Sequence, residues 1–99
     1  MVLNLENYEP ISVCKCSDDG IKTLTKALEL RKEFQNLEQY KNDSESLKTM
    51  SSLNNNWRLI RDQCLMKFGS KLFKPSSCNN PDKIQDLREK LDALGIRTS

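Results

Sequence analysis

The sequence contains no histidine and only three glycines. Histidine is the side chain used most often for acid-base catalysis near neutral pH, so its absence removes the commonest catalytic group. Gly20, Gly69 and Gly95 are isolated from one another, and isolated glycines cannot form either common phosphate-binding loop. A cysteine nucleophile would need a base that is not present. We therefore predict that the protein is not an enzyme, and we nominate no catalytic residue.

Valine is also scarce, since Val2 and Val13 are the only examples, and the other β-branched residues do not alternate with polar ones. A β-sheet has almost no material here, so the expected fold class is all-α. No apolar run approaches the roughly 20 residues that span a bilayer. Residues 1–20 lack the basic start and apolar block of a signal peptide. These absences predict an intracellular protein, cytoplasmic or nuclear, without membrane association.

The apolar content is low and the charged content is high. Apolar residues make up 36% of the chain, below the roughly 45–50% that is typical of globular proteins. Such a chain builds a thin core, which a disulfide, a metal, a cofactor or a partner protein can supplement. The 16 basic and 14 acidic residues leave a formal net charge of only +2. That charge supplies no strong field for attracting nucleic acid or an anionic membrane.

Four cysteines raise the question of a metal site or disulfides. Cys14 and Cys16 form a C-x-C pair. Cys64 and Cys78 lie far downstream, and 13 residues separate them. A structural zinc site usually needs a second close pair, and no histidine can substitute for it, so we expect no metal and no other cofactor. Disulfides need an oxidising compartment, for which the sequence gives no sign. We predict reduced thiols, with Cys64 acting as a small buried hydrophobe.

The most regular apolar pattern lies in residues 47–68. Its members are separated by steps of three or four, which places them on one stripe of a helix. They are Leu47, Met50, Leu53, Trp57, Ile60, Cys64 and Phe68. A second amphipathic segment covers about residues 19–41, with Asp18 and Asp19 as candidate N-caps. The two segments predict an antiparallel helical hairpin.

Two positions could separate these helices. Asn42 followed by Glu45 resembles a capping box, which predicts a second helix over about residues 45–68. Alternatively, the first helix runs on to about Ser52 and the chain breaks at the three asparagines 54–56. We prefer the first break because the apolar stripe keeps its phase across the asparagines.

The clearest helix boundaries enclose residues 81–94. Asn80 is a good N-cap, Pro81 suits the first helical position, and Gly95 marks the end. The apolar residues of this helix follow the 3-4-3 spacing of a coiled-coil seam, and they are the candidate partner-binding residues: Ile84, Leu87, Leu91 and Leu94. Two heptads are too short to be stable alone, so the seam must pack on something. It either completes a three-helix bundle with the hairpin or binds a partner helix, as the long connection over residues 69–80 would allow.

Residues 1–17 carry an acidic excess, and we predict a loosely ordered N-terminal arm. Residues 18–99 form the single helical domain. An alternative is that the arm is a short docking peptide, with Leu3, Leu5, Tyr8 and Ile11 as its apolar anchors.

Basic residues gather in residues 58–74, where only Asp62 opposes them. They form a possible basic surface: Arg58, Arg61, Lys67, Lys71 and Lys74. They are interleaved with Trp57, Phe68 and Phe73, and cations beside aromatic rings are what a nucleic-acid surface needs. The simpler interpretation is a solvated helical face, because Trp57 and Phe68 belong to the buried stripe. An acidic protein surface is a further candidate ligand.

The features together predict a non-enzymatic helical protein-protein interaction subunit or adaptor of a larger intracellular assembly. Its partner would be another protein or a second copy, bound through helix packing. A nucleic-acid-binding module that uses the basic face of residues 58–74 is the alternative. No motif in the chain assigns it to a family.

Overall fold

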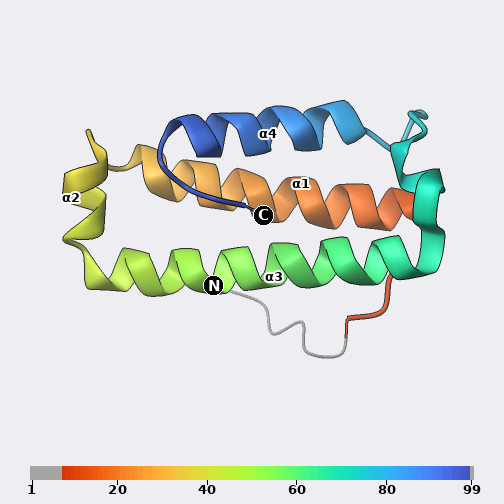
Figure 1. The fold of residues 1–99 in the computed structure, drawn as a ribbon, viewed down its shortest axis with the longest axis horizontal. Helices are drawn as coiled ribbons and strands as arrows, with labels where there is room; N and C mark the ends of the chain where they lie inside the picture. Colours follow the sequence, from red (N-terminus) through yellow and green to blue (C-terminus); the bar gives the residue numbers. More distant parts are fainter. Residues whose placement is uncertain (1–7, 99) are drawn as a thin grey trace.

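The computed structural model describes residues 8–98, which form a small helical bundle without strands. Its elements are α1 (Val13–Lys32), α2 (Leu37–Lys41), α3 (Ser44–Phe68), the 3-10 helix η1 (Gly69–Phe73) and α4 (Pro81–Ala93). Helices α1 and α3 pack antiparallel, and α4 packs on α1, so α1 lies between the other two long helices (Figure 1). The predicted all-α class is confirmed.

Helix α1 begins at Val13, six residues before the expected start near residue 19. Ser12 is the N-cap, because its hydroxyl oxygen accepts a hydrogen bond of 3.0 Å from the backbone amide of Lys15. Asp18 and Asp19, predicted as caps, lie inside the helix. Asp19 pairs there with Lys15 at 3.1 Å. The last residues of the predicted loose arm are therefore the first turn of α1.

Helix α1 also ends early, at Lys32 instead of residue 41, and the chain turns before the short helix α2. Asn36 caps α2 by accepting a 2.9 Å hydrogen bond from the backbone amide of Gln39. The Gln39 side chain in turn accepts from the amide of Gln35 at 3.2 Å. A capping residue followed by glutamine three positions later is a local start signal, and its hydrogen bonds favour a new helix over continuation of α1.

Helix α3 runs unbroken through the three asparagines, which confirms the preferred separation of the hairpin helices. Its N-cap is Asp43, one residue later than expected, since the Asp43 carboxylate accepts a 3.3 Å hydrogen bond from the amide of Ser46. Most of the predicted stripe is buried, with at most 5% of each side chain exposed: Met50, Leu53, Trp57, Ile60 and Cys64. Leu47 is 39% exposed and Phe68 is half-buried at the two ends.

Helix α4 begins at the predicted residue, Pro81, and ends one residue before the predicted end. The Asn80 side chain accepts a 3.0 Å hydrogen bond from the amide of Lys83, and the helix ends at Ala93, just before Gly95. Gly95 has a φ of +88°, which favours glycine and turns the chain back towards the core. Leu87 and Leu91 are buried, so the seam packs on this chain's own helices.

The three long helices meet at Gly20, inside α1. A Cβ atom built at Gly20 would lie 3.1 Å from Trp57 Cζ3 of α3 and 3.4 Å from Ile84 Cδ1 of α4. The absence of a side chain therefore lets both helices approach the same part of α1. The sequence alone did not indicate this role for Gly20, because its tertiary neighbours are far away along the chain.

The C-terminal segment folds back over the bundle (Figure 1). The indole nitrogen of Trp57 donates a 2.7 Å hydrogen bond to the backbone carbonyl of Thr98. Arg31 donates to the carbonyl of Leu94 at 3.0 Å, and Ile96 is buried in the main core. These contacts connect the end of the chain to both α1 and α3.

Both tyrosines should ionise at a higher pH in the folded chain than in the unfolded chain. Burial raises the pKa of Tyr40. Burial, and then a 2.7 Å hydrogen bond donated to Asp19, raises the pKa of Tyr8. In the unfolded chain both should titrate near the ordinary value of 10.0. The stability that the neutral phenols contribute is thus complete below that pH and lost as pH rises through the raised pKa values.

Phenolate absorbance, measured against pH with and without denaturant, checks this expectation. The variant Tyr8→Phe leaves Tyr40 as the only reporter and separates the two transitions. Coincident titration of the folded and unfolded chains would contradict the assignment.

Candidate functional site

The four cysteines form two disulfides, Cys14–Cys78 and Cys16–Cys64, so the prediction of reduced thiols is wrong. The paired Cα atoms lie 5.1 Å and 6.2 Å apart, within the usual range for a disulfide. The C-x-C spacing turns the two cysteines of α1 in different directions, one towards α3 and one towards the connection before α4. Only the folded arrangement brings each to its partner. Cys64 is buried as expected, with 2% exposed.

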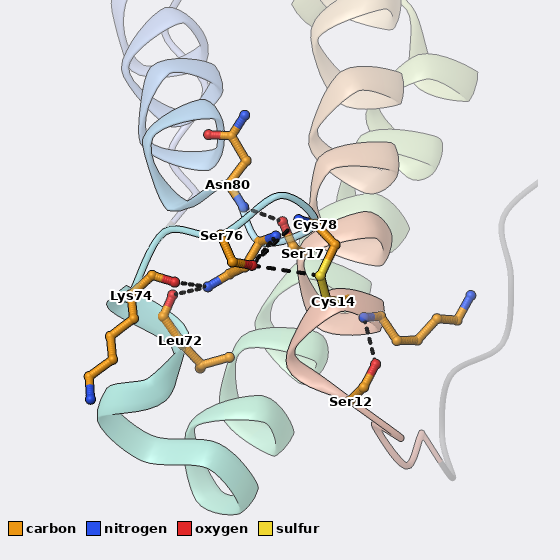
Figure 2. The surroundings of a disulfide bond; sticks show 10 residues. Ser12, Cys14, Ser17, Leu72, Lys74, Ser76, Cys78 and Asn80 are labelled. Carbon is orange, nitrogen blue, oxygen red and sulfur yellow. Dashed lines mark hydrogen bonds between the residues drawn. A yellow bond between two sulfur atoms is a disulfide. The ribbon is translucent and has the colours of Figure 1, made fainter.

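The connection between η1 and α4 is pinned to α1 by a disulfide and a hydrogen bond (Figure 2). Cys78 bonds to Cys14, and the backbone amide of Asn80 donates to the Ser17 hydroxyl at 2.9 Å. The buried side-chain amide of Asn79 donates to the carbonyls of Leu72 and Lys74, at 3.1 and 2.8 Å. The connection therefore fixes η1 and the start of α4 against the bundle. Of the two alternatives for the last helix, the structure contains packing on the chain's own helices, and binding of a partner helix stays a prediction.

A groove of about 460 Å³ lies between the C-terminal half of α3, η1 and the N-terminal half of α4. Cys16 and Ser17 of α1 contribute to its lining. The apolar part of the lining comes mainly from six residues: Trp57, Ile60, Leu65, Leu72, Phe73 and Ile84. A mostly apolar lining and a volume of a few hundred Å³ are typical of binding sites in proteins.

Large apolar side chains are exposed around this groove. Phe73 is 67% exposed and Leu65 is 39% exposed, and both line the groove. Single exposed apolar residues are normal, but exposed apolar residues that line a groove are typical of an interaction site.

Polar side chains also line the groove, and two of them are arginines. The guanidinium of Arg88 lies 5.7 Å from the centre of the Trp57 ring and donates from Nε to the Thr98 hydroxyl at 3.1 Å. Arg61 donates from Nε to the carboxylate of Asp62 at 3.1 Å. Asp82, at the start of α4, supplies a negative charge to the lining.

The predicted partner-binding seam divides between the core and the groove. Leu87 and Leu91 are 3% and 0% exposed in the core. Ile84 is half-buried and lines the groove, while Leu94 packs at the edge of the core. The structure therefore places the four residues in contact with this chain, and their role in binding a partner stays a prediction.

The predicted basic surface is not one continuous site. Arg61 lines the groove. The ammonium group of Lys67 donates to the Pro10 carbonyl at 2.7 Å. Lys71 and Lys74 are exposed on η1 and just after it, on either side of Phe73.

Arg58, also in this set, is exposed on α3 and does not line the groove. Of the arm's proposed anchors, Leu3 and Leu5 lie outside the described residues. Tyr8 packs beside the Cys16–Cys64 disulfide, and Ile11 is 78% exposed.

The sequence analysis missed the groove and the place of Phe73 in its wall. The available signal was the apolar pair Leu72 and Phe73, flanked by lysines, in a segment that looked like a simple connection. Its packing depends on α3 and α4, which approach each other only in the folded bundle.

Family models, curated proteins and solved structures give no match to this chain. Among residues 8–98, no group of three or more histidine, cysteine, aspartate or glutamate side chains is placed to hold a metal ion. None of the helices in this part of the chain is long and apolar enough to cross a membrane.

Proposed function

We propose that this chain is a non-enzymatic helical binding module that binds a segment of a partner protein in the groove between α3, η1 and α4. The observation that carries the proposal is the apolar groove of about 460 Å³ with the exposed side chains of Phe73 and Leu65 beside it. An aromatic side chain in such a position can bury a large area when a partner covers it.

The groove supports this proposal better than the seam of α4 does. Leu87 and Leu91 already contact the core, so a partner could reach them only by displacing α4 from α1. The groove needs no such rearrangement. Its walls are held in place by the pinned connection and by the Cys16–Cys64 disulfide.

We further propose that the protein works in an oxidising compartment. Disulfides persist in secreted proteins and in oxidising compartments, and they are rare in the cytosol and nucleus. Cys14–Cys78 and Cys16–Cys64 together use all four cysteines. The sequence predicted a cytoplasmic or nuclear location. The two disulfides do not favour that prediction.

Selection of random peptides displayed on phage, with the oxidised chain as bait, tests the binding proposal. Peptides that bind should lose affinity by at least about tenfold for the variant Phe73→Ala, because a central aromatic contact commonly contributes more than 1 kcal/mol. The affinity is measured by fluorescence polarisation of labelled peptide.

Ile11→Ala is the matched control, since Ile11 is 78% exposed and does not line the groove. Circular dichroism confirms that both variants fold. Failure to enrich any peptide, or an equal effect of the two substitutions, would contradict binding in the groove.

A further inference from the structure

Positive charge lies on one side of the groove. Arg61 of α3 lines it, and Lys71 and Lys74 are exposed on and next to η1. Among residues 8–98, neither lysine has a carboxylate partner within ion-pair distance. Asp62 is the only acidic residue between positions 58 and 74. The α4 side is mixed, with Asp82 and Arg88.

The two arginines of the lining contact this chain's own residues. Thr98 and the Trp57 ring hold the guanidinium of Arg88, whereas Arg61 forms an exposed ion pair with its neighbour Asp62. A guanidinium carries five N–H donors, so each arginine retains donors beyond the one at Nε. A fixed guanidinium binds a carboxylate with less loss of side-chain freedom, and it can do so with two parallel hydrogen bonds.

We propose that the segment bound in the groove is acidic: it buries a large apolar side chain against Phe73 and places carboxylates next to Arg61 and Arg88. This inference rests on the proposed function and adds the chemistry of the partner. The charge complementarity of a basic α3–η1 side carries it. The phosphates of a nucleic acid could pair with the same cations. However, a nucleic acid also needs exposed rings on which its bases stack, and of the two rings in the lining Trp57 is only 5% exposed, which leaves Phe73. An acidic peptide fits the groove better than a nucleic acid does.

The peptide selection described above tests the inference through the residues that flank the apolar anchor. Aspartate and glutamate should be enriched there relative to the unselected library. A selected peptide is then compared with the same peptide carrying glutamine for glutamate, on the oxidised protein and on the variant Arg61→Gln. The acidic peptide should lose up to about fivefold in affinity on Arg61→Gln, whereas the glutamine peptide should lose almost nothing.

Lys26→Gln is the matched control, because it removes the same charge from an exposed position of α1 that does not line the groove. It should leave the affinity unchanged. Enrichment of apolar peptides without acidic residues, or equal effects of Arg61→Gln on both peptides, would overturn the inference and leave the proposed function standing. Enrichment of no peptide would overturn both.

A random single-stranded oligonucleotide serves as competitor in the same assay. It should not displace the acidic peptide at physiological salt. Displacement that disappears steeply as salt rises would overturn the acidic-peptide inference in favour of nucleic acid.

Discussion

Reduction of the two disulfides should lower the free energy of unfolding by several kcal/mol. The bonds join residues 64 and 48 positions apart, and loops of these lengths correspond to about 4 kcal/mol each in the chain-entropy estimate. The two loops overlap, so the total should be less than the sum. Because a domain of this size is stable by only about 5–15 kcal/mol, reduction should remove a large share of its stability.

Denaturant unfolding followed by circular dichroism, with and without a reducing agent, measures this effect. Replacing one pair at a time with alanine separates the bonds. Loss of Cys16–Cys64 should cost more, because both cysteines are buried beside Ile60 and their replacement leaves poorer packing. Loss of Cys14–Cys78 should mainly free the connection before α4. Equal unfolding midpoints of the reduced and oxidised chains would contradict a structural role for the bonds.

Replacement of Trp57 by alanine should destabilise the fold by about 3–5 kcal/mol, the usual cost of removing a large buried aromatic side chain. Trp57 is 5% exposed and contacts all three long helices or the segments next to them. Its ring lies against Gly20 of α1 and beneath Arg88 of α4, and its indole nitrogen holds the carbonyl of Thr98. Alanine would leave a cavity where α1, α3 and α4 meet.

Trp57→Phe is the matched variant, because it keeps an aromatic ring but cannot donate to the Thr98 carbonyl. It should cost about 1–3 kcal/mol, since a buried acceptor loses its partner. Equilibrium unfolding in denaturant gives both values. A cost below about 1 kcal/mol for Trp57→Ala would show that the three helices do not depend on this contact.

The helices could be predicted wherever local signals agree with one another. The apolar stripe of α3 keeps its phase through the asparagines, and a continuous helix is what the structure contains. The start of α4 depends on hydrogen bonds within a few residues of Asn80, so it too is visible in the sequence. The predicted start of the first helix was wrong because Ser12 and Asp18 are both good N-caps, and local propensity does not distinguish between them.

The candidate site was less accessible to prediction because it joins residues that are distant along the chain. Ile84 and Arg61 were singled out for the seam and for the basic surface, and both line one groove. Phe73 was noted only as a ring among the basic residues, since nothing in its neighbourhood in the sequence distinguishes a groove wall from a connection. Cys14 and Cys16 were interpreted from their spacing alone, and the spacing does not show which cysteine each of them bonds to.

Composition, periodicity and capping residues of this chain determine that it is all-α and where its third and fourth helices run, because helical hydrogen bonds and apolar stripes are local properties. Only the tertiary structure decided that α4 packs on its own chain, that Cys14 meets Cys78 and Cys16 meets Cys64, and that a groove lies between α3 and α4. Each of these depends on how distant segments approach one another, as α3 and α4 approach α1 at Gly20, and such an approach follows from the shape of the packed surfaces.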